Sequence, residues 1–154
     1  MEEKIKFLKE VRDIVDKFAE REGRRPRIML ANFGFAENDH AITETATALA
    51  DMGFDIDMEP WGRDYIDVVQ DALDNDVHVI AVNSLKGEYD VLLVKLLEEL
   101  ASYDREDIML AVSGQIVAHN VKDMYGRGAS AVLVNNGYVD FAKEILSELE
   151  IILF

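Results

Sequence analysis

Short apolar runs alternate with amphipathic segments along almost the whole chain. Residues 4–21 carry apolar side chains at spacings of three and four. This spacing places one set on a single helix face that we expect to be buried: Phe7, Leu8, Val11, Ile14, Val15 and Phe18. The predicted strands are 28–33, 54–58, 77–82, 108–112 and 131–134, and the helices expected after them are 40–52, 64–74, 88–102, 117–126 and 138–149. This alternation indicates a parallel sheet covered by helices on both faces.

The order of these elements predicts an α/β fold behind an N-terminal amphipathic helix. Strand–helix–strand connections are right-handed, so they wind helices onto both faces of a five-stranded parallel sheet. For such a doubly wound sheet we expect the flavodoxin-like strand order 2-1-3-4-5. Gly23 and Pro26 end the first helix. We therefore divide the chain into a helix at 1–23 and an α/β domain at 24–154.

Composition excludes several kinds of chemistry. The chain has 154 residues, enough for a full-sized core, and it contains no cysteine. Thiolate metal sites, disulfides and cysteine nucleophiles are therefore excluded, and a reducing cytoplasm is the expected location. No apolar run approaches the roughly 20 residues of a membrane-spanning helix. The opening Met-Glu-Glu-Lys has no signal-peptide core.

Charge is unevenly distributed. Residues 1–27 hold 9 of the 16 basic residues and 7 of the 31 acidic ones, a balance of +2. The total is −15, so residues 28–154 carry −17. A body this acidic repels phosphate backbones, and nucleic-acid binding is not expected.

Ligands of doubly wound sheets bind beyond the carboxyl ends of the strands, near the switch point between strands one and three. Four predicted loops lie there: 34–41, 83–88, 113–120 and 135–138. A dinucleotide fingerprint needs three glycines after strand one, and only Gly34 is present. A phosphoryl receiver needs carboxylates where Asn32 and Asn83 stand. No Gly-x-Ser-x-Gly elbow is available for a serine nucleophile.

Several short segments together point to a known family. They are Gly-Arg-Arg-Pro-Arg-Ile at 23–28, Ala-Asp-Met-Gly-Phe-Asp at 50–55, Asn-Asp-Val-His-Val at 75–79, Ser-Leu at 84–85 and Arg-Glu-Asp-Ile at 105–108. Over 24–137 the chain resembles the cobalamin-binding domain at the C-terminal end of methylmalonyl-CoA mutase and related acyl-CoA mutases. Most of the matching residues are framework residues, which speak for the fold rather than for retained binding.

The resemblance also implies that the cobalt ligand has been lost. The family carries Asp-x-His-x-x-Gly after strand one, and its His binds cobalt; the same register here gives Ala36, Asn38 and Ala41. An amide oxygen is a poorer ligand for cobalt than an imidazole nitrogen. Ala36 also removes the carboxylate that would polarise the imidazole. A two-residue slip would let His40 imitate the motif, but the ungapped register on both sides favours Asn38, so we predict no metal ligand.

The other three binding loops depart from the family as well. Its Ser-x-Leu reads Asn-Ser-Leu at 83–85, its Gly-Gly after strand four reads Ser-Gly at 113–114, and its Gly-Pro-Gly type turn reads Asn-Asn-Gly at 135–137. Changes in all four loops predict that cobalamin binding is lost or weakened. The degenerate binding positions are Ala36, Asn38, His40, Ala41, Asn83, Leu85, Ser113, Gly114, Asn136 and Gly137, and we predict no catalytic residue.

The remaining histidines are expected to be structural. His78 follows Asp76 at strand three, where we expect a half-buried, hydrogen-bonded framework role. His119 lies at the ligand-facing rim, where a surface role is expected. The three histidines lack the short spacing of a zinc site. No pair of carboxylates has a convincing acid–base arrangement.

Three functions are compatible with this pattern. The first is a non-catalytic subunit or interaction domain, bound to a mutase-type large subunit or to itself, with cobalamin binding lost or weakened. The second is a functional corrinoid-binding small subunit of a methylmalonyl-CoA-mutase-type isomerase, whose partner would supply the substrate barrel. The third is a small-ligand sensor that uses the amide-rich rim. The chain is not expected to be catalytic alone.

Overall fold

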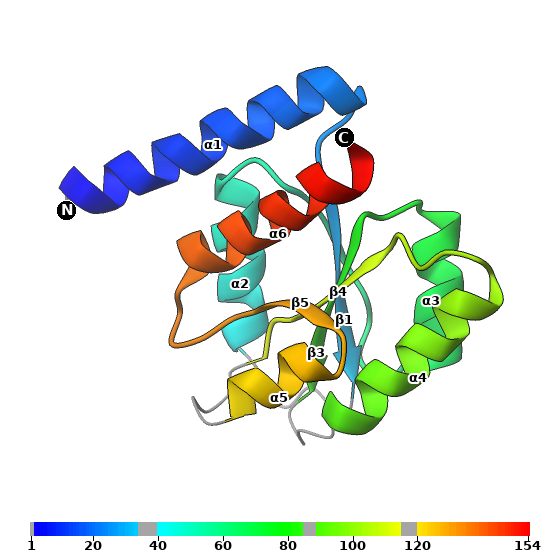
Figure 1. The fold of residues 1–154 in the computed structure, drawn as a ribbon. Coiled ribbons are helices and arrows are strands. Elements are labelled where there is room, and N and C mark those ends of the chain that lie inside the picture. The colour runs from blue at the N-terminus through cyan, green and yellow to red at the C-terminus, as the bar shows by residue number, and fades with distance from the viewer. Residues whose placement is uncertain (1, 34–39, 85–88, 115–119) are drawn as a thin grey trace.

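A computed structural model describes residues 2–33, 40–84, 89–114 and 120–154 (Figure 1). The elements are α1 (Glu2–Glu22), β1 (Arg27–Phe33), α2 (His40–Asp51), β2 (Asp55–Met58), α3 (Tyr65–Asp74), β3 (Val79–Ser84), α4 (Tyr89–Ser102), β4 (Met109–Val112), α5 (Val121–Gly126), β5 (Ala129–Val132) and α6 (Tyr138–Leu153). The strands form one sheet in the order β2-β1-β3-β4-β5, and each adjacent pair is parallel. The predicted doubly wound fold and strand order are confirmed.

Two hydrophobic clusters lie on opposite faces of the sheet. Alternate strand residues such as Ile28 and Leu30 pack with α1, α2 and α6. The residues between them, such as Met29 and Ala31, pack with α3, α4 and α5. All four side chains are fully buried, as period-two alternation in a strand covered on both faces requires.

Among the ends that the structure describes, β3, β5 and α6 differ most from their predicted bounds. β3 begins at Val79 rather than at residue 77, because Asp76 has a φ of +48° and still belongs to the preceding turn. β5 covers 129–132 instead of 131–134, next to a register shift in the β4–β5 ladder. α6 continues to Leu153, four residues past the predicted end, since no glycine or proline stops it. The predicted start of the helix at 117–126 lies outside the described residues.

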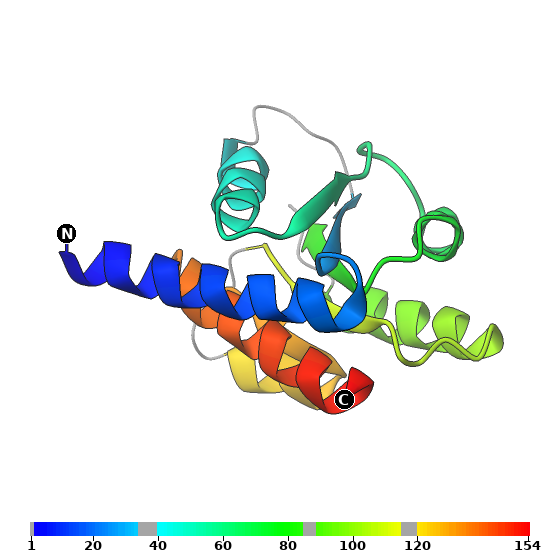
Figure 2. The same ribbon diagram turned by 90° about the horizontal axis from the view of Figure 1, so that it is seen from above.

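The N-terminal helix α1 packs on the same core as α2 and α6 (Figure 2). Val11 and Val15 are fully buried, and Phe18 is 4% exposed. Phe7 and Ile14, which we expected on the buried face, are 42% and 43% exposed. The burial predicted for these two side chains is wrong, because α1 contacts its neighbours through only one narrow stripe of side chains.

No helix in the described part of the chain is long and apolar enough to cross a membrane.

Candidate functional site

Two buried asparagines meet at the switch point of the sheet. Asn32 of β1 and Asn83 of β3 are register partners, and they are 1% and 6% exposed. Asn83 Nδ2 donates to Asn32 Oδ1 at 3.4 Å, and Asn32 Nδ2 donates to the backbone carbonyl of Glu59 at 2.7 Å. These amides therefore link the carboxyl ends of β2, β1 and β3 inside the protein.

The next strand end is closed by an aromatic side chain. Gly114 follows β4, and a Cβ atom built there would overlap the hydroxyl of Tyr89 and lie 2.8 Å from Asn83 Oδ1. Tyr89, the first residue of α4, is only 7% exposed. Ser113 is also buried, and its Oγ donates to the carbonyl of Val82 at 3.4 Å. The space above Gly114 is thus filled by side chains of this protein.

The turn after β5 lines a separate groove. Asn135 and Asn136 have φ angles of +49° and +59°, a left-handed conformation that asparagine tolerates. The amide of Gly137 donates to the carbonyl of Val134 at 2.9 Å, and α6 begins directly afterwards. Asn136 and Gly137 line a groove between α1, α2 and α6, whereas Asn83, Ser113 and Gly114 come together under Tyr89. The structure therefore divides the predicted positions between two places.

The remaining predicted positions lie wholly or partly outside the described part of the structure. Ala36, Asn38 and Leu85 lie outside the described residues. His40 and Ala41 open α2, but their side chains lie outside the described part of the structure. The register that substitutes Asn38 for the family's histidine therefore stays a prediction. Among the described residues, no three histidine or carboxylate side chains are arranged to hold a metal ion.

Sequence reasoning missed the carboxylate next to this site. Glu59 follows β2 and is 6% exposed, and its Oε2 forms no hydrogen bond. The guanidinium of Arg63 lies 3.9 Å from Glu59 and 2.7 Å from Asp71 of α3. Burial raises the pKa of Glu59 to about 7; Asp71 adds to the rise and the Arg63 charge opposes it. The only signal in the sequence was its place directly after a strand.

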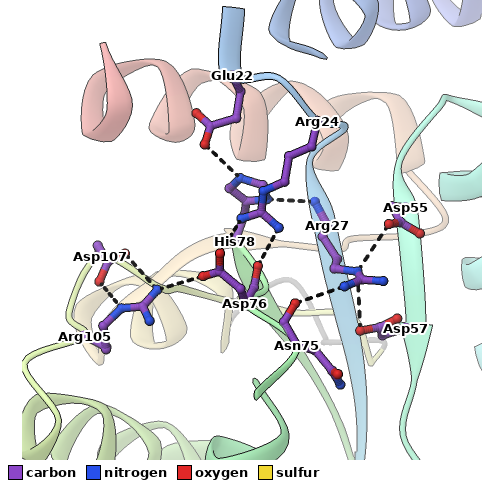
Figure 3. A network of polar contacts seen from close by, with 10 residues as sticks. All are labelled: Glu22, Arg24, Arg27, Asp55, Asp57, Asn75, Asp76, His78, Arg105 and Asp107. Atoms are coloured by element: carbon purple, nitrogen blue, oxygen red, sulfur yellow. Dashed lines mark hydrogen bonds and ion pairs between the residues drawn. The ribbon is translucent and has the colours of Figure 1, made fainter. Parts of the chain in front are cut away.

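A second polar cluster lies at the opposite end of the strands, where they begin (Figure 3). Its members are Glu22, Arg24, Arg27, Asp55, Asp57, Asn75, Asp76, His78, Arg105 and Asp107. Arg27 Nε lies 3.2 Å from Asp55 Oδ2, an ion pair that joins β1 to β2. Arg24 donates to the carbonyl of Asp76 at 2.6 Å, and Arg105 forms an ion pair with the Asp76 carboxylate at 3.3 Å. The network ties three strand starts and the end of α1 together.

His78 is the buried centre of this network. Its Nδ1 accepts a hydrogen bond from the backbone N–H of Arg27 at 2.9 Å, and its Nε2 lies 3.8 Å from Glu22 Oε1. The ring also meets Phe18 edge-on, with 5.5 Å between the centroids. Burial lowers the pKa of His78, and the positive charge of Arg24 lowers it further. The predicted hydrogen-bonded framework position of this histidine is confirmed, and its burial is deeper than expected.

The network explains which kind of residue carried the family resemblance. Eight of its ten members fall in the segments 23–28, 50–55, 75–79 and 105–108. These segments lie where the strands begin, at the end of the sheet opposite to the ligand-facing loops. Their agreement with the family therefore reports on the fold and leaves the binding loops undetermined.

Comparisons with known proteins identify relatives among methylmalonyl-CoA mutases. No family model matches the chain. The methylmalonyl-CoA mutase large subunit of Streptomyces virginiae is 37% identical over 143 residues, which cover 90% of this chain and 20% of that protein. The probable large subunit of Mycobacterium tuberculosis is 42% identical over 120 residues, which cover 78% of this chain and 16% of that protein. The chain thus spans about a fifth or less of the length of the curated relatives it matches.

A solved structure shares the fold. A cobalamin-binding protein from Desulfitobacterium hafniense superposes with a TM-score of 0.64 at 15% identity, covering 80% of this chain and 59% of that one. The class is therefore a flavodoxin-like α/β fold, which this chain shares with that cobalamin-binding protein. Within that class, the chain is homologous over most of its own length to methylmalonyl-CoA mutase large subunits.

Proposed function

We propose that this chain is a non-catalytic interaction domain or subunit of a methylmalonyl-CoA-mutase-type assembly, in which cobalamin binding is lost or weakened. The observation that carries the proposal is the filled space above Gly114, where Tyr89 and Asn83 stand against the glycine. The homology to mutase large subunits supports the type of assembly. Among the described residues, no group of three histidine or carboxylate side chains could hold a metal ion.

The packing at Gly114 argues against the cofactor on physical grounds. In the family that this chain resembles, glycines after strand four let the backbone approach the cofactor without interference from a Cβ atom. Here a ligand on that side of Gly114 would meet the hydroxyl of the buried Tyr89, which even a Cβ atom would overlap. It would also meet Asn83 Oδ1, which lies 2.8 Å from the position of a Cβ atom at Gly114. The described residues of this site do not fit the cofactor.

The matching region covers only a small part of the curated relatives. The curated relatives are about five or more times longer than the region that this chain matches. A mutase-type assembly containing this chain would therefore draw its substrate-binding part from sequence outside these 154 residues. We expect affinity capture from cells that naturally produce this chain to recover a large mutase-type protein.

Cofactor binding is tested by mixing the chain with hydroxocobalamin or adenosylcobalamin, followed by gel filtration and a visible spectrum. We expect no co-elution for the natural chain. A second protein carries Ala36→Asp, Asn38→His and Ala41→Gly together with Asn83→Ser and Tyr89→Phe, which restore the family motif and remove the hydroxyl against Gly114. This protein should bind the corrinoid and change its spectrum.

A control protein carries the same four other substitutions, with Tyr103→Phe in place of Tyr89→Phe. Tyr103 is suitable because it is 48% exposed and lies beyond the end of α4. Co-elution of cobalamin with the natural chain, accompanied by a spectral change, would contradict the proposal. It would identify the chain as a functional corrinoid-binding subunit. Equal corrinoid affinity of the variant with Tyr89→Phe and of the control with Tyr103→Phe would show that Tyr89 does not obstruct the site.

A further inference from the structure

An apolar groove of about 620 Å³ lies between α1, α2 and the start of α6. Leu8, Ala48, Met52 and Val139 contribute apolar surface to it. Three carboxylates, from Glu44, Asp51 and Asp140, also line the groove. Among the described residues that line the groove, none is basic. Its chemistry therefore suits an apolar side chain flanked by positive charges.

The first turns of α1 have the complementary chemistry. In both ribbon views they extend past α2 and the start of α6, so the body of the protein does not cover them (Figures 1 and 2). Ile5 lies almost one turn before Leu8 and is 61% exposed, and Phe7 is 42% exposed. Residues 4–12 contain four basic residues and one acidic residue, a balance of +3. An exposed apolar segment with this charge is the partner that the acidic groove would select.

We propose that the groove receives the first half of α1 from a second copy of this chain. Leu8 lines the groove of its own copy, so a two-fold axis close to Leu8 would place each α1 against the groove of the other molecule. The exchange is isologous, because each copy supplies one helix and one groove. It would cover Ile5 and would set Lys6 and Lys9 near the groove carboxylates. This inference does not depend on cobalamin binding or on a mutase-type partner.

The first test measures the mass of the full chain by sedimentation equilibrium over a concentration series. We expect the mass to double as concentration rises. Ile5→Glu should weaken the dimer by about tenfold or more, because a carboxylate would enter an acidic, apolar groove. The matched control is Ile66→Glu, since Ile66 of α3 is also exposed, at 49%, on the other face of the sheet. Circular dichroism should show both variants folded, because each side chain is exposed in the single chain.

A charge exchange makes the test specific for a second copy. Glu44→Lys with Asp140→Lys reverses the groove, and Lys6→Glu with Lys9→Glu reverses the helix. Each protein alone should be monomeric, because like charges would meet in both halves of its dimer. An equimolar mixture should regain the doubled mass, because each helix then meets a groove of opposite charge. The proposal is overturned by a natural chain that stays monomeric, by a dimer that tolerates Ile5→Glu, or by a mixture that stays monomeric.

Discussion

The strongest prediction concerns Glu59, the buried carboxylate after β2. Replacing Glu59 with Gln keeps the shape of the side chain and removes its charge. The side chain is 7% exposed, and its nearest cation, Arg63, is 3.9 Å away and is bound more closely by Asp71. The charged form of Glu59 is therefore poorly compensated, and the neutral amide should be better tolerated at high pH.

The magnitude follows from the pKa. In the folded protein the pKa of Glu59 rises from 4.5 to about 7. Each pKa unit corresponds to about 1.4 kcal/mol, so the ionised carboxylate costs at most about 3.5 kcal/mol of folding stability. The folded state holds the proton more tightly than the unfolded state between these pH values. Stability from this group is therefore greatest below pH 4.5 and is lost as pH rises through 7.

The assay is denaturant unfolding of the natural chain and of Glu59→Gln at a series of pH values from about 5 to 8. We expect the Gln variant to be more stable at pH 8 by about 1 to 3 kcal/mol, with a smaller difference at pH 5. Glu98→Gln, at an exposed position on α4, is the matched control and should follow the natural chain. A Gln variant with the same pH dependence as the natural chain, or with lower stability at pH 8, would refute the reasoning.

Three further substitutions test the packing. His78→Leu should cost about 1 to 3 kcal/mol because the amide of Arg27 loses its acceptor, whereas His78→Asn keeps an oxygen there and should cost less. Because the pKa of His78 is lowered in the folded protein, the natural chain should lose stability below pH 6.5, and neither variant should show that loss. Gly114→Ala should cost about 1 to 3 kcal/mol through overlap with the Tyr89 hydroxyl, and a double-mutant cycle with Tyr89→Phe should recover part of the loss; additive costs would contradict the contact. Gly53→Ala should cost about 1 kcal/mol or more in thermal unfolding, because its φ is +99°; an unchanged midpoint would show that no strain is present.

The candidate site was predictable only in part. Sequence identified Asn83, Ser113 and Gly114 as neighbours of the ligand-facing edge, because carboxyl ends of parallel strands meet there. It did not identify Tyr89 as the group that fills the space above Gly114, since the direction of a side chain at the start of a helix depends on its packing. It also did not predict that Asn136 would line a separate groove.

The sequence by itself determined the types of element, the strand order and the class of protein. Strand and helix periodicities are local properties, and crossover handedness leaves few ways to connect five parallel strands. Only the tertiary structure decided which charges and amides are buried together. Asn32 and Asn83 lie 51 residues apart, as do Arg27 and His78, and no local pattern encodes their contacts. Burial then decides the chemistry, because the same carboxylate or imidazole titrates differently once water is removed from it.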